Sequence, residues 1–212
     1  MKHGMTLSKP IIGVTGNSGS GKGTVCLILR DLGGLCLDAD KAAHMVMESG
    51  RPAYNEICDL FGNDILAPDG SIDRIKLGGI VFHEPIKRKV LESIVHKQVK
   101  LEFERLSTED NNHAFIIWDA PLLAEACMHK KCSLVLLITA PFSLKLSRIM
   151  NRDGITEERA ILRLSNQPSD DALYKRITGD IGKSLVKVIE NNGSIKDLEY
   201  KTRLAVCDLR VI

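Results

Sequence analysis

Several patterns that mark other classes of protein are absent from this sequence. No run approaches about 18 apolar residues, so no membrane-spanning helix is expected. Residues 1–10 lack the apolar core of a secretion signal. The six cysteines show neither C-x-x-C nor zinc-ligand spacing, which favours buried, reduced thiols: Cys26, Cys36, Cys58, Cys127, Cys132 and Cys207. These absences predict a cytoplasmic protein.

Charge and length limit the remaining classes. The formal net charge is only +2, and no basic stripe with interleaved aromatic residues is present, so neither a nucleic acid nor a membrane is expected as a partner. We see no internal repeat. The 212 residues, 44% hydrophobic and 26% charged, suit one globular domain with a sizeable core.

The strongest signal lies at residues 11–24. An apolar run at 11–15 predicts a buried strand, and G-N-S-G-S-G-K follows it, matching G-x-x-x-x-G-K. Such a loop wraps phosphates with backbone N–H groups at the start of a helix, predicted here at 25–30, and Lys22 can reach the β- and γ-phosphates. Glycine-rich turns also occur in ordinary α/β domains, but strand, helix and lysine together favour nucleotide binding.

Further apolar runs alternate with helical patterns. We predict strands at 35–37, 114–118, 134–138 and 185–189, and a final helix that begins with a capping box at Ser194 and Asp197. Residues 51–105 show only helical patterns, the longest beginning at Pro85, and residues 167–183 are polar and suggest a mobile segment. The alternation predicts a doubly wound α/β domain with its site at the carboxyl edge of a parallel sheet.

Two aspartates follow predicted strands at that edge. Asp40 could cap the next helix or accept a proton from the hydroxyl that receives a phosphoryl group. Asp119 could likewise be a cap, or lie near Mg²⁺. A phosphate loop at the same edge favours the catalytic alternatives.

Several basic side chains have two possible roles. Arg148 and Arg152 are four residues apart, so on a helix they face the same way and could clamp a phosphoryl group or form a solvated basic face. Arg74 and His96 could bind the acceptor substrate. Residues of these types are more often a surface ion pair and a structural histidine, and only their place in the helical insertion favours acceptor binding.

Taken in order, these motifs resemble the dephospho-coenzyme A kinase family over nearly the whole chain. The matching segments are V-T-G-N-S-G-S-G-K at 14–22, L-D-A-D at 37–40, F-G at 61–62, D-G at 69–70, D-R at 73–74, D-A-P-L-L at 119–123, and V-I-E-N-N-G-S at 188–194. The resemblance implies a P-loop nucleoside triphosphate hydrolase type of fold, with a five-stranded parallel core. It also implies transfer of the γ-phosphoryl group of ATP to the ribose 3′-hydroxyl of dephospho-coenzyme A, with Mg²⁺.

The resemblance also implies a role for each matching position. Catalytic roles fall on Asp40, Lys22, Thr15 and Arg148. ATP-binding positions are Gly19, Ser20, Gly21, Lys22, Gly23, Thr24, Arg152 and Asn191, and acceptor-binding positions are Asp40, Arg74, His96, Asp119 and Leu122. Thr24 and Asp119 are the candidate magnesium ligands.

The implied organisation is a single kinase domain over residues 1–212. Its core comprises about 9–50, 113–147 and 184–212, with a helical acceptor-binding insertion at about 51–112 and a lid at about 148–183. Gly23 stands where the family generally has serine, giving the G-K-G-T form of adenylate-kinase-like enzymes, and His44 stands where it has arginine. Another nucleoside or nucleotide kinase, or a nucleotide-binding regulator without catalysis, are the alternatives.

Overall fold

The computed structural model describes residues 9–209, which form two compact units. One unit runs to residue 37 and resumes at residue 107, and the other comprises residues 38–106. Within the described residues, no helix combines the length and apolar character needed to cross a membrane.

The elements alternate as the sequence predicts. In chain order they are β1 (Ile11–Thr15), α1 (Lys22–Asp31), β2 (Gly34–Asp38), α2 (Ala39–Val46), α3 (Pro52–Phe61), η1 (Asn63–Ile65), α4 (Arg74–His83), α5 (Pro85–Glu109), β3 (Phe115–Asp119), η2 (Met128–Lys131), β4 (Leu134–Thr139), α6 (Phe142–Asp153), α7 (Glu157–Ser165), α8 (Asp170–Ile181), η3 (Lys183–Leu185), β5 (Val186–Glu190) and α9 (Ile195–Val206). All five predicted strands are present, with ends that differ by at most one residue.

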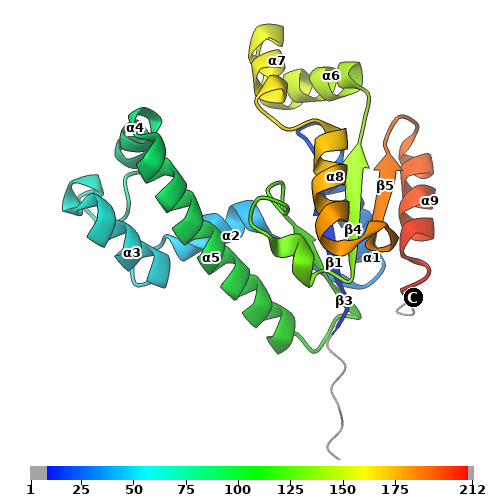
Figure 1. Ribbon diagram of the computed structural model, residues 1–212, viewed down its shortest axis with the longest axis horizontal. Helices are drawn as coiled ribbons and strands as arrows, with labels where there is room; N and C mark the ends of the chain where they lie inside the picture. Colours follow the sequence, from blue (N-terminus) through cyan, green and yellow to red (C-terminus); the bar gives the residue numbers. More distant parts are fainter. Residues whose placement is uncertain (1–8, 210–212) are drawn as a thin grey trace, which may run out of the picture. The chain divides into compact units, whose positions relative to one another are not determined.

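The first unit is built on a five-stranded sheet in the order β2-β3-β1-β4-β5 (Figure 1). The β1–β3, β1–β4 and β4–β5 pairs are parallel. After β1 the chain goes to one side of the sheet for β2 and β3, then crosses to the other side for β4 and β5. The point where strand order reverses therefore lies beside β1, and ligands bind at such a point in open α/β sheets.

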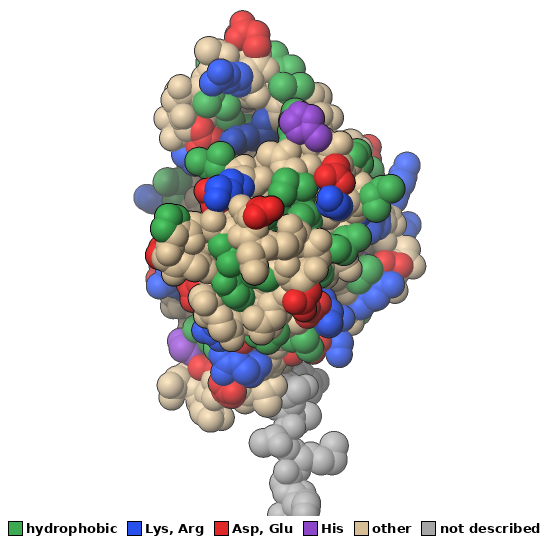
Figure 2. Space-filling model, turned by 90° about the vertical axis from the view of Figure 1, so that its left-hand side faces the viewer, with side chains coloured by type: hydrophobic (Ala, Val, Ile, Leu, Met, Phe, Trp, Pro, Cys, Tyr) green, Lys and Arg blue, Asp and Glu red, His purple; other side chains and the backbone are tan. Residues whose placement is uncertain are grey.

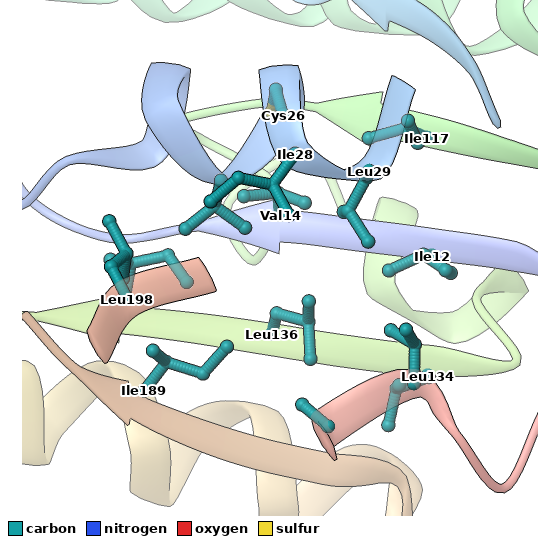
Figure 3. Close-up of a cluster of buried hydrophobic side chains, with 14 of the residues drawn as sticks. Ile12, Val14, Cys26, Ile28, Leu29, Ile117, Leu134, Leu136, Ile189 and Leu198 are labelled. Atoms are coloured by element: carbon teal, nitrogen blue, oxygen red, sulfur yellow. The ribbon is translucent and has the colours of Figure 1, made fainter. Parts of the chain in front are cut away.

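The main core fills the space between the sheet and helices α1 and α9. Figure 3 shows Val14, Leu136 and Ile189 of the sheet together with Leu29 of α1 and Leu198 of α9. Helices cover this face of the sheet and bury the side chains, which is why the strands of such a parallel sheet are apolar. This packing holds the carboxyl ends of the strands in fixed positions.

Residues 167–183, which the sequence suggests are a mobile segment, contain a helix. Residues 170–181 form α8, which Ser169 caps by accepting a hydrogen bond from the Ala172 N–H. Leu173 and Ile177 are buried, and their spacing of four places both on one face of the helix. Two buried apolar residues therefore anchor a short polar helix that the sequence did not predict.

The second unit consists of helices and one isolated antiparallel bridge between Leu66 and Ile72. Its buried side chains include Ile57 of α3 and Ile65 of η1.

Positive and negative side chains are interspersed on the face of the molecule drawn in Figure 2, in keeping with the small net charge.

Candidate active site

The loop between β1 and α1 adopts a conformation that only glycine accepts readily. The backbone φ angles of Gly16, Gly19 and Gly21 are 142°, 74° and 102°. A Cβ on Gly19 would lie 2.5 Å from the Lys145 carbonyl oxygen, and a Cβ on Gly21 would lie 2.1 Å from Nδ2 of Asn191. These two glycines therefore allow close packing against α6 and the segment after β5.

Lys22 folds back over this loop. Its Nζ donates to the carbonyl oxygens of Gly16, at 2.8 Å, and Asn17, at 3.4 Å. Lys22 is also the first residue of α1, so its charge lies at the positive end of the helix dipole. The lysine and the helix terminus together make the loop a site for a polyanion.

Ser20 supports the same conclusion independently. Its side chain is completely buried, and its Oγ has no hydrogen-bond partner within the described residues. A buried unpaired hydroxyl costs about 1–3 kcal/mol, and a phosphate oxygen or an ordered water would satisfy it. The loop thus fits the phosphate chain that the sequence motif predicts.

Arg148 of α6 and Asn191 after β5 hold the loop from outside. The Arg148 guanidinium donates to the carbonyl oxygens of Gly19 (3.2 Å) and Asn191 (3.3 Å) and to Oδ1 of Asn191 (3.4 Å). Asn191 Nδ2 donates to the Ser20 carbonyl oxygen at 2.8 Å. Both predicted site residues therefore contact the phosphate loop, although they lie far from it in sequence.

Arg152 has different partners, despite its helical spacing from Arg148. Its guanidinium donates twice to the Asp153 carboxylate, at 2.7 and 3.0 Å, and Arg163 pairs with the same carboxylate. The pKa of Asp153 is lowered to about 2, chiefly by the hydrogen bonds from Arg152 and to a smaller extent by that from Arg163. In this structure Arg152 is thus part of an ion-pair cluster on α6 and α7.

A second set of loop contacts was not predicted as part of the site. Asn17 Nδ2 donates to Asp170 Oδ1 at 2.9 Å, and the buried Lys145 donates to the other oxygen of Asp170 at 2.9 Å. Gln167 accepts from the Ser18 N–H at 2.9 Å. These residues are separated by up to about 150 positions, so no local pattern in the sequence reveals the contacts.

The other predicted site residues of the first unit lie near the ends of β1 and β3 and at the start of α1. Val14 pairs with Asp119 in the parallel register, and the Thr15 hydroxyl donates to the Pro121 carbonyl oxygen at 3.2 Å. Leu122 is half exposed, and Thr24 lies in the first turn of α1. No helix begins at Asp119, so its interpretation as a helix cap is wrong.

A pair of thiols lies beside Asp119. Ligand atoms of Cys26, Cys36 and Asp119 are all within 4.8 Å of one another. The pKa of the Cys26 thiol is raised, chiefly by a hydrogen bond with Cys36 and further by burial and the nearby Asp119 carboxylate. The expectation that the cysteines are buried is correct for Cys26 and Cys132, whereas Cys127 and Cys207 are exposed.

The second unit contains the other predicted site residues. Asp38 caps α2 by accepting from the Lys41 N–H at 3.0 Å, which leaves Asp40 in the first turn without a capping role. The Arg74 guanidinium lies 3.0 Å from Nε2 of His44. His96 is half buried on α5. Because Asp38 is the cap of α2, the interpretation of Asp40 as the cap is wrong.

The strand order and the lysine-bearing glycine loop at the switch point define a P-loop nucleotide-binding protein. A model of the dephospho-CoA kinase family matches residues 10–197. The chain belongs to the dephospho-CoA kinase family, so it is a kinase of coenzyme A biosynthesis that uses ATP.

Relatives and solved structures agree with this assignment. The chain is 37% identical to the dephospho-CoA kinase of Moorella thermoacetica, over 94% of this chain and 92% of that protein. It is 39% identical to that of Carboxydothermus hydrogenoformans, over 88% of each. The crystal structure of TT1252 from Thermus thermophilus has a TM-score of 0.73 at 32% identity, covering 95% of this chain and 98% of that one. The dephospho-CoA kinase from Campylobacter jejuni has a TM-score of 0.60 at 27% identity, with 94% and 96% covered.

Proposed function

We propose that Asp40 accepts the proton of the ribose 3′-hydroxyl of dephospho-coenzyme A during phosphoryl transfer. The hydroxyl oxygen forms a bond to the γ-phosphorus of ATP, the bond from that phosphorus to the β,γ-bridging oxygen breaks, and ADP leaves. The observation behind the proposal is the position of Asp40 in the first turn of α2, where Asp38 already serves as the cap. A carboxylate that is not engaged as a cap can act as a general base.

The phosphate loop supplies the charge stabilisation in this proposal. Lys22 and the loop N–H groups bind the β- and γ-phosphates, where they stabilise the charge that develops during transfer. Arg148 holds the loop through the Gly19 carbonyl oxygen, and Asn191 through that of Ser20. In the same proposal Arg152 would bind the phosphates of ATP, and Asn191 would lie near its adenine.

We further propose Asp119 and Thr24 as the residues that would hold Mg²⁺, with Gly23 unable to contribute a hydroxyl. Oxygen donors of this kind are those that Mg²⁺ prefers, and the bound ion neutralises phosphate charge. A Cβ on Gly23 would meet no atom within 4 Å, so serine fits at this position. The insertion at about 51–112, with Arg74 and His96, would bind the acceptor, and residues 148–183 would form a lid.

Replacement of Asp40 tests the assignment of the base. Asp40→Asn should lower turnover by about 100-fold or more, the scale of general-base loss, while ATP affinity stays nearly unchanged. Asp38→Asn is the matched control, because asparagine also caps helices and should leave turnover near normal. Near-normal turnover of Asp40→Asn would exclude it as the base.

The product identifies the reaction. The protein is incubated with Mg²⁺-ATP and dephospho-coenzyme A, and the mass and phosphate position of the product are determined. Coenzyme A with a new 3′-phosphate is expected. Preferential use of AMP or a nucleoside would indicate another nucleotide kinase, and ATP binding without turnover on any acceptor would indicate a regulator.

A further inference from the structure

A cluster of two thiols and one carboxylate lies where three elements of the first unit meet. Cys26 projects from α1, Cys36 lies on β2, and Asp119 ends β3. β2 and β3 are neighbours in the sheet. Phe115, Ile117 and Asp119 alternate along β3, so Asp119 shares the face that packs against α1. Both cysteines belong to or pack against the same buried cluster.

The ligand atoms lie close enough together to be compared with those around a single metal ion. All three lie within 4.8 Å of one another. With bonds of about 2.3 Å to sulfur and about 2.0–2.2 Å to oxygen, a tetrahedral Zn²⁺ places its ligand atoms roughly 3.4–3.8 Å apart. Binding one ion therefore requires these atoms to approach one another by at most about 1.4 Å from the 4.8 Å limit. In the described part of the chain, no other group of three His, Cys, Asp or Glu side chains meets this condition.

We propose that Cys26, Cys36 and Asp119 form a site for one Zn²⁺ ion, with the fourth position open to water. Two sulfur donors disfavour Mg²⁺, which takes oxygen ligands, whereas Zn²⁺ accepts both thiolate and carboxylate. Cys26 is buried, while Cys36 and Asp119 are partly exposed and provide a route of entry. As the two sulfur–zinc bonds form, the two thiol protons pass to solvent.

The site has a consequence for catalysis that rests on the proposed function. Asp119 is the residue that we propose for Mg²⁺, so a zinc ion bound by Asp119 and the two thiolates removes its carboxylate from that role. Zinc should therefore inhibit phosphoryl transfer in the presence of excess Mg²⁺, and a chelator should reverse the inhibition.

Metal binding itself is the first test, because it requires no turnover. The reduced, metal-free full chain is titrated with Zn²⁺ against a chromophoric chelator, and with Co²⁺ to detect thiolate-to-cobalt charge-transfer absorption. One equivalent of each metal should bind. Cys36→Ala should weaken zinc binding at least about 100-fold, since loss of even an outer-shell partner costs 10–100-fold. Cys58→Ala is the matched control and should bind like the wild type.

Folding and oxidation are checked in the same samples. Circular dichroism and urea unfolding establish that Cys36→Ala is folded, and Asp119→Asn, which keeps both thiols, should retain the cobalt–sulfur absorption with weaker affinity. Equal zinc affinity in Cys36→Ala and wild type, or no charge-transfer band, would overturn the proposal. A Cys26–Cys36 disulfide formed with peroxide, with no zinc uptake by the reduced protein, would also overturn it.

Activity separates this site from the proposed function. Zinc should inhibit wild type and Cys58→Ala, while Cys36→Ala should retain turnover and resist inhibition. If zinc binds through the cysteines with no effect on turnover, the zinc site stands and the role of Asp119 in phosphoryl transfer fails.

Discussion

Adding one methyl group to Gly19 should damage the phosphate loop, whereas adding it to Gly23 should not. The φ angle of Gly19 is 74°, in the left-handed region, where a Cβ costs roughly 1–2 kcal/mol. The new Cβ would also lie 2.5 Å from the Lys145 carbonyl oxygen and 2.9 Å from its Cα. Because these are backbone atoms of α6, either the loop or the helix must move.

The expected magnitude follows from the contacts that such a movement breaks. The Arg148 guanidinium donates to the Gly19 carbonyl oxygen, and hydrogen bonds to charged groups contribute about 1.5–3 kcal/mol. With the backbone strain, Gly19→Ala should lower the free energy of unfolding by about 2.5–5 kcal/mol. If the loop relaxes instead, ATP affinity should fall at least about tenfold, which corresponds to about 1.4 kcal/mol.

Gly23→Ala provides the matched control. A Cβ there meets no atom within 4 Å, and Gly23 lies in the first turn of α1. Since alanine is favoured over glycine in helices by about 0.8–1.0 kcal/mol, the control should be neutral or slightly stabilised. Urea unfolding and calorimetric titration with ATP measure both effects. Unfolding free energy and ATP affinity equal to those of Gly23→Ala would refute the steric argument for Gly19.

Three further predictions concern the loop clamp, the core and the α6–α7 ion pairs. Arg148→Lys should weaken ATP binding about tenfold in calorimetry, because one ammonium cannot replace hydrogen bonds from two guanidinium nitrogens; unchanged affinity would contradict this. Leu136→Ala should cost about 2–5 kcal/mol in urea unfolding, since the side chain is fully buried, and a loss below 1 kcal/mol would argue against its place in the core. The pKa of Asp153 is lowered to about 2 by Arg152 and Arg163, so its stabilisation is complete above the unfolded pKa of about 3.9 and is lost as pH falls toward 2. Hydrogen exchange in α6 and α7 should show this loss in wild type, whereas Asp153→Asn should remove the pH dependence.

Local patterns in the sequence predicted most of the fold correctly. Apolar runs gave the strands, because a strand covered on both faces must be apolar throughout. Ser194 and Asp197 form the predicted capping box, which depends only on residues three apart. The helix α8 was missed because its two buried residues, Leu173 and Ile177, are too few to produce a strong periodic signal.

The phosphate loop, its lysine and the helix behind it were determined by the sequence alone, because that motif is one continuous segment whose local geometry follows from its glycines. Only the tertiary structure decided which distant groups hold the loop, namely Arg148, Asn191 and the Asn17–Asp170 pair. The same is true of Cys26, Cys36 and Asp119, whose spacing in the chain resembles no metal motif. Such contacts depend on strand order and on crossover connections, which place residues together at one sheet edge independently of their separation in sequence.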